Sequence, residues 1–339
     1  MRSRMEWRVH YPKAVEAAHL PFFLLLGQND YMNAENEVLP KLVLDARTFQ
    51  KPLSDLTETI ALKVQREGAG RGLKPDFVVV DIYFLLRQAQ QICDLFFFVN
   101  ADERRKKDVD WRAAYSVVSL PLIRTMIDCL YNVTAILWDP GVKRYQFRGS
   151  GYKLTLEALD ADERRYGGDP RWDADIARRR EMIALGMRMD GVTEAEVKAT
   201  KTWPTLSGYL RENPVPAPHQ EFLRKLTFGF WQEYSGMGHA TFQGLLPIAL
   251  FLAPKDLPHE ERPKVDMATE SVVFLHVSRV AAVLVCMLTE VQAYCRFDGA
   301  RINQRLHEVW NALLPVPEIK ELYDERYAKL MSDKGINPE

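Results

Sequence analysis

The sequence predicts an all-α protein with a helical bundle core and a peripheral charged helical insertion. Apolar residues recur at helical spacing through four segments, residues 76–99, 110–138, 220–253 and 270–297. Alternating runs of β-branched residues, the pattern typical of strands, do not occur. Helices with an apolar side bury that side against one another, so we expect these four segments to form the bundle.

The composition limits the classes of function. The 339 residues are 47% hydrophobic, which is enough for a sizeable core. The formal net charge of −1 provides no overall field that would attract the chain to nucleic acid or to an anionic membrane, although a local basic patch is compatible with it. No segment of about 20 residues is apolar without a charge, so we expect no association with a membrane.

Four cysteines lie inside apolar helical patterns, and none forms a Cys-x-x-Cys pair. Such cysteines are typical of buried, reduced thiols, and we therefore expect a cytoplasmic protein. The short apolar run at residues 20–26 contains Pro21 and lacks a small-residue cleavage site, so it does not predict a signal peptide.

Two sections are expected along the chain. Residues 1–76 predict a loose N-terminal helical section, with short helices at 34–49 and 53–67 and a glycine-rich loop at 68–75. Residues 77–339 are expected to form the bundle domain.

Within the bundle domain, residues 143–213 are more charged and less apolar than the rest, and they predict a peripheral insertion. Residues 160–190 contain seven arginines and eight acidic residues. This balance favours a surface helix with many ion pairs. A surface that binds RNA is the alternative.

The segment at residues 110–140 carries charge inside an apolar helix. Arg124, Asp128 and Asn132 fall along one stripe at about 100° per residue. A charge in such a helix needs a partner, because burying it alone is costly. We therefore predict a hydrogen-bonded ion pair between Arg124 and Asp128 inside the bundle. Pro121 predicts a kink in this helix, or two helices in tandem.

A second set of polar residues lies near the end of a helix that we expect at residues 220–234. Tyr234 and Ser235 come first, and His239 follows them. Ser235 and His239 share a face if the helix continues. The glycines on either side of Met237 indicate either a break or a close approach of another backbone.

Two interpretations of these residues stay open. Apolar helices of one domain usually pack together, so Arg124 and Asp128 could meet Tyr234, Ser235 and His239. The set is then either an internal polar network that fixes helix register, or a catalytic site. In the second case His239 transfers protons and Arg124 holds an anion. The sequence contains no glycine-rich phosphate loop, no paired metal ligands and no Gly-x-Ser-x-Gly motif, so we expect neither a cofactor nor a metal.

Other polar residues of the apolar helices are expected to be structural. His276 and Arg279 lie one turn apart within the segment 270–297, and we expect His276 to be a core histidine with its hydrogen bonds satisfied. Cys129 has no neighbouring base in its segment, so we expect a buried thiol and not a nucleophile.

The helix with Arg124 and Asp128, followed much later by Tyr234, Ser235 and His239, resembles certain uncharacterised all-helical bacterial proteins. Those proteins are similar in outline to the HEPN superfamily, whose members are often ribonucleases of toxin and phage-defence systems. The resemblance covers residues 110–140 and 228–250, and it implies a role in nucleic-acid processing or phage defence. In that superfamily a histidine follows the catalytic arginine at short spacing, and no histidine follows Arg124 in this way.

Two functions are therefore expected. The first is a HEPN-like, ribonuclease-type or defence protein that uses the five residues above, with RNA as its partner. The alternative is a non-catalytic helical protein with a buried polar network, which binds a protein or senses a small ligand. A homodimer is compatible with both. A positive cleft open to solvent around Arg124 and His239 would favour the first, and a sealed polar network would favour the second.

Overall fold

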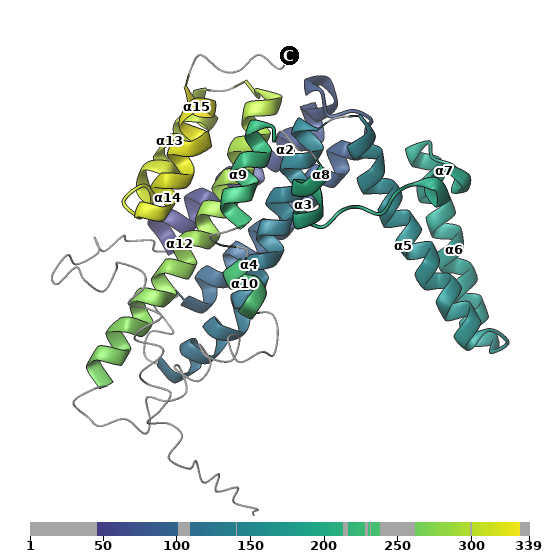
Figure 1. Ribbon diagram of the computed structural model, residues 1–339, viewed down its shortest axis with the longest axis horizontal. Coiled ribbons are helices and arrows are strands. Elements are labelled where there is room, and N and C mark those ends of the chain that lie inside the picture. The colour runs from purple at the N-terminus through teal and green to yellow at the C-terminus, as the bar shows by residue number, and fades with distance from the viewer. Residues whose placement is uncertain are drawn as a thin grey trace, which may run out of the picture. The chain divides into compact units, whose positions relative to one another are not determined.

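The structure, a computed structural model, describes residues 46–100, 109–139, 141–212, 216–227, 230, 232–237, 262–298 and 300–332. The chain divides into two compact units, Met1–Lys41 and Leu42–Glu339, and all of these residues belong to the second. The described residues form helices and turns and contain no strand, which confirms the predicted all-α fold (Figure 1). Most of the helix expected at residues 34–49 lies outside the described residues.

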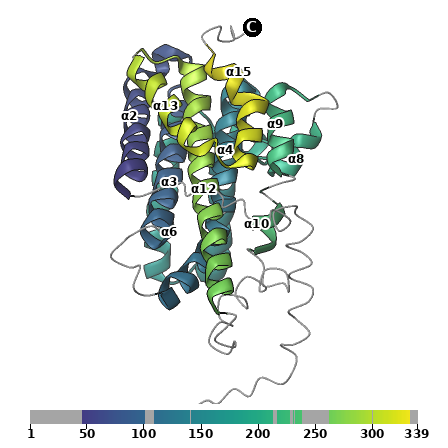
Figure 2. The ribbon, with the colours of Figure 1, turned by 90° about the vertical axis from the view of Figure 1, so that its left-hand side faces the viewer.

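Three long helices form the centre of the bundle, and each packs against the other two (Figure 2). They are α3 (Phe77–Asn100), α4 (Val109–Trp138) and α12 (Arg262–Cys295). Their bounds confirm three of the four predicted apolar helices, and α12 begins earlier than expected. The predicted apolar face of α3 is buried along its length, at Val78, Ile82, Leu85, Ala89, Ile92 and Phe96.

Helix α4 is continuous across Pro121, so the alternative of two helices in tandem is wrong. A proline inside a helix removes one backbone hydrogen bond. Leu120 and Ile123, on either side of the proline, are buried in the core. The burial of these side chains opposes a break at this position, since each fully buried apolar side chain contributes about 1.5–3 kcal/mol.

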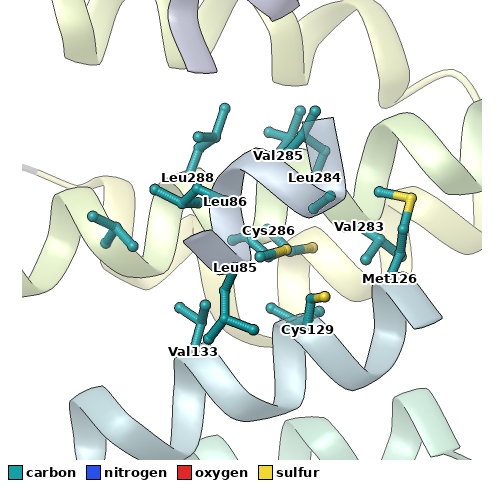
Figure 3. Close-up of a cluster of buried hydrophobic side chains, with 14 of the residues drawn as sticks. Leu85, Leu86, Met126, Cys129, Val133, Val283, Leu284, Val285, Cys286 and Leu288 are labelled. Carbon is teal, nitrogen blue, oxygen red and sulfur yellow. The ribbon is translucent and has the colours of Figure 1, made fainter. Parts of the chain in front are cut away.

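Helix α12 is enclosed on all sides over a long stretch of its second half. Every side chain from residue 276 to residue 292 is buried. A helix that is apolar on all sides is expected at the centre of a core. Figure 3 shows part of this core, where α3, α4 and α12 meet through Leu85, Leu86, Met126, Cys129, Val133, Val283, Leu284, Val285, Cys286 and Leu288.

Among the described residues, two segments are long and apolar enough to cross a membrane by length and composition alone, Ser119–Trp138 and Phe274–Cys295. Most of each segment is buried inside the protein, as in the core helices of soluble proteins, and the match is therefore weak evidence for a membrane span.

Helix α2 (Lys51–Glu67), which lies in the section that we expected to be loose, is part of the same core. It packs against α3 and buries its apolar face, namely Leu53, Leu56, Ile60 and Val64. The glycine-rich segment after it forms a single 3₁₀ turn, Gly68–Arg71. Gly72 then has φ 93°, a left-handed conformation that favours glycine.

The charged section forms a helical hairpin of α5 (Val142–Tyr166) and α6 (Pro170–Asp190), which lie side by side (Figure 1). The short helix α7 (Glu194–Ala199) packs on α5. These three helices share a small apolar cluster of their own, Leu156, Met187 and Val197. Arg179 and Arg180 of α6 pair with carboxylates of α5, as expected for a surface helix with many ion pairs.

Shorter helices complete the described fold. They are α8 (Leu206–Glu212), α9 (Pro218–Leu226), α10 (Gln232–Met237), α13 (Ala300–Leu313), α14 (Pro317–Leu322), the π-helical segments Ala46–Gln50 and Tyr323–Tyr327, and α15 (Ala328–Met331). The segment predicted as one helix over residues 220–234 contains two α-helices, since α9 ends at Leu226 and α10 begins at Gln232. Thr227 and Phe230, between them, have the wider π-helical geometry that interrupts an α-helix.

Candidate functional site

Helix α10 packs against α4, so the two helices that carry the candidate residues meet. Arg124 and Asp128 of α4 are half-buried, and so is Ser235 of α10. Tyr234, in contrast, is fully buried. His239 lies outside the described residues.

The ion pair between Arg124 and Asp128 stays a prediction. Both side chains keep part of their surface in contact with solvent, so they do not lie deep inside the bundle as we expected. Further along α4, the stripe that contains Arg124 and Asp128 contacts the segment just before α8 (Leu206–Glu212). There, Asn132 Oδ1 accepts a hydrogen bond of 2.9 Å from Trp203 Nε1, and Tyr131 donates one of 2.9 Å to the carbonyl of Pro204.

Tyr234 joins α10 to α12 through a buried polar network. Its hydroxyl lies 2.7 Å from Nδ1 of His276 and 3.0 Å from Nη1 of Arg279. A guanidinium can only donate, so the tyrosine oxygen accepts from Arg279. The direction of the hydrogen bond between the Tyr234 hydroxyl and Nδ1 of His276 depends on the tautomer of the imidazole. Burial, together with the positive charge of Arg279, lowers the pKa of His276 to about 3.

Arg279 is the centre of this network. Its guanidinium donates two hydrogen bonds to Glu318 of α14, of 2.7 and 2.9 Å, and one of 2.8 Å to Glu233 of α10. The same group lies 4.8 Å from the centre of the Phe230 ring, a distance typical of a cation–π contact. The pKa of Glu233 is raised by burial, although Arg279 opposes that shift. These hydrogen bonds hold α10 and α14 against α12.

A second network surrounds Glu290, a carboxylate of α12 that is fully buried. Arg326 donates to both of its oxygens, at 2.5 and 2.8 Å. Tyr327 and Trp138 donate to it as well, at 3.1 and 2.6 Å. This network joins α12 to α4 and to the segment Tyr323–Tyr327. Four donors compensate for the loss of water around the charge.

The predictions for two other residues are confirmed. His276 is a buried histidine that is hydrogen-bonded within the core. Cys129 is a buried thiol whose pKa is raised to about 12 by burial, with a further contribution from Asp128, so it is a poor nucleophile. All four cysteines are buried and free.

Sequence analysis missed the partners of Arg279 and Glu290. The available signal was the presence of lone charges inside a segment otherwise made of apolar residues. Among the described residues, no group of three histidine, cysteine or acidic side chains is arranged to hold a metal ion.

No protein-family model, no curated protein and no solved structure matches this chain. The fold and the candidate site define the class of protein as an all-α protein whose central helix carries two buried ionic networks.

Proposed function

We propose that the protein is a HEPN-like helical protein that processes RNA at the junction of α4 and α10. The observation that supports this proposal is the packing of α10 on α4, with Arg124, Asp128 and Ser235 only half-buried. A half-buried guanidinium can still reach a phosphate, and its planar shape fits two phosphate oxygens at once.

Each residue has a distinct role in this proposal. Arg124 binds the phosphate, and Asp128, one turn away, is the positioning residue that orients it. Ser235 orients the attacking hydroxyl group. His239, outside the described residues, stays the predicted proton donor or acceptor. Tyr234 has no direct part in the chemistry, because its hydroxyl is fully engaged with His276 and Arg279.

The direct test is incubation of the purified protein with structured RNAs, with and without divalent metal. We expect cleavage by the wild-type protein, and a loss of about 10²–10⁴ in rate for His239→Ala, as is usual when a general acid or base is removed. Arg124→Gln should also reduce the rate. Arg87→Gln is the matched control, because Arg87 is a half-buried arginine of a different helix, bonded to Gln90.

The absence of cleavage in every RNA and metal condition would rule out the enzyme. If Arg87→Gln reduces the rate as much as Arg124→Gln does, the enzyme stands but the proposed role of Arg124 is ruled out. Circular dichroism of each variant separates loss of activity from loss of the fold.

A second candidate is the non-catalytic one, an interaction or small-ligand-sensing protein. The observation that favours it is the enclosed network of Tyr234, His276 and Arg279, in which the polar groups find their partners inside the protein. Such networks fix the register of helices without chemistry. If this candidate is correct, His239→Ala destabilises the fold, and no RNA is cut by any variant.

A further inference from the structure

Arg148 of α5 connects the α5–α6 hairpin to the bundle. Its Nη2 lies 3.2 Å from Oδ1 of Asp81 on α3, and also donates a hydrogen bond of 3.2 Å to the carbonyl of Phe77. Its Nε lies 3.3 Å from Oδ2 of Asp190, the last residue of α6. Tyr152 donates a hydrogen bond of 2.5 Å to that same oxygen.

The charges of this Arg148 cluster are not balanced. Two carboxylates, one from the bundle and one from the hairpin, share a single guanidinium. Their side chains are only 11% and 16% exposed, so water screens them poorly. Asp190 also ends a helix, where the helix dipole disfavours a negative charge.

The guanidinium of Arg148 lies at similar distances, 3.2 and 3.3 Å, from the two carboxylates. Within the described part of the chain, its Nε is buried without a well-aligned hydrogen bond, although Asp190 is near. A buried donor in this condition is unfavourable, because it has lost its hydrogen bonds to water without a full replacement. The cluster therefore holds one excess negative charge and one poorly satisfied donor at the contact between α3 and the hairpin.

We propose that the Arg148 cluster is a proton-operated latch, which holds the α5–α6 hairpin more tightly against α3 when the carboxyl group of Asp81 is protonated than when it is ionised. The groups that face Asp81 are Arg148 and Tyr152 of α5 and Asp190 of α6. A proton on Asp81 removes the repulsion between the two carboxyl groups and leaves the guanidinium of Arg148 paired with Asp190.

The direction of the effect follows from linkage. Burial raises the pKa of Asp81 from 3.8 to about 6; Arg148 opposes this shift and Asp190 adds to it. In the open state Asp81 is exposed, with a pKa near its ordinary value. The closed state therefore binds more protons between these two values, and acidification favours it. A fall from about pH 7.5 to about pH 5 shifts the closing equilibrium about tenfold.

Hydrogen exchange measured by mass spectrometry tests the latch on the full chain. After correction for intrinsic exchange rates, amides of α5 and α6 should be about tenfold better protected at about pH 5 than at about pH 7.5. Amides of residues 276–292 in α12 provide the internal reference and should not change to the same extent.

Two variants sharpen the test. Asp81→Asn keeps the shape of the protonated carboxyl group. In this variant, the protection of the α5–α6 amides from hydrogen exchange should no longer depend on pH. Asp162→Asn removes a hairpin carboxylate that pairs with Arg179, away from the Arg148 cluster, and should keep the pH dependence. The proposal is overturned if the wild-type hairpin shows no pH dependence, if α12 changes equally, or if Asp81→Asn retains the full dependence. The hydrogen-exchange measurement on the wild-type protein tests the proposal by itself, even if a variant does not fold.

Discussion

Two charged side chains, Arg279 and Glu290, lie in the buried stretch of α12, and both obtain partners from distant parts of the chain. Arg279 is held by residues 46 positions before it and 39 positions after it. The hydrogen bonds leave neither charge isolated, which matters because the loss of water around a buried ion costs several kcal/mol. At this scale the buried charges of α12 have partners inside the protein, whereas Arg124, Asp128 and Ser235 are half-buried.

His276 should stay neutral throughout the physiological pH range. Its pKa in the folded protein is lowered to about 3, whereas a histidine in the unfolded chain has a pKa of about 6.5. The unfolded chain therefore binds more protons between these values. The stability linked to His276 is fully present above about pH 6.5 and is lost as the pH falls toward about 3.

Carbon-13 NMR of labelled histidine checks this expectation. The His276 resonance, assigned by its loss in His276→Gln, should not move between about pH 8 and about pH 5. The urea-unfolded protein provides the comparison, because its histidines titrate near pH 6.5, about their ordinary pKa. A His276 midpoint near that of the unfolded chain would show that the imidazole is not held neutral by the core.

At the scale of elements, the α5–α6 hairpin differs from the bundle in how much apolar surface it buries. With α7 it shares a cluster of three buried side chains, Leu156, Met187 and Val197. Much of its remaining contact is made by ion pairs at exposed positions, and such pairs contribute little to stability. In contrast, α12 is buried over seventeen consecutive residues, 276–292.

Limited proteolysis should therefore cut first within residues 143–213. Local opening requires less free energy where fewer apolar contacts are lost. Trypsin at low enzyme ratio, followed by mass spectrometry of the fragments, identifies the first sites. Arginines are plentiful in this section, so chymotrypsin is the control for sequence preference. Initial cuts inside residues 119–138 or 276–292 would contradict the prediction.

At the scale of the whole second unit, the described residues share one main core, which extends from Phe49 to Tyr327. The two ionic networks meet α12 about three turns apart, at Arg279 and at Glu290. Arg279 holds α10 and α14, and Glu290 holds α4 and the segment Tyr323–Tyr327. Elements that are remote in the sequence therefore depend on the same central helix.

Arg326→Met should destabilise this unit strongly. The change leaves the fully buried carboxylate of Glu290 without its charged partner, which typically costs about 3–5 kcal/mol. Urea unfolding followed by circular dichroism measures the difference. Lys320→Met is the matched control, because Lys320 pairs with Asp324 at the surface, where the effect should be within about 1 kcal/mol.

Equal midpoints for Arg326→Met and wild type would mean that the carboxylate has an alternative partner. The double variant Glu290→Gln with Arg326→Met should recover part of the loss, since it removes the unpaired charge together with its partner.

The sequence by itself determined the elements of this protein. Apolar periodicity placed α3, α4 and the buried part of α12, and it identified the buried face of α3 from Val78 to Phe96. The helical pattern is local, because it depends on which side chains share a face within a few turns. Local pattern also identified Arg124 and Asp128 as charges in an apolar helix, and His276 as a core residue.

Only the tertiary structure decided which polar groups meet and how deep they lie. The sequence allowed Tyr234 to meet Arg124, but its hydroxyl bonds to His276, 42 residues away, and to Arg279. Arg124 and Asp128 are half-buried, because the depth of a helix face depends on the elements that cover it. The partners of Glu290 come from α4 and from a segment 36 residues beyond it. Such contacts have no periodic signature, since they are set by the packing of whole helices and not by the spacing of residues within one.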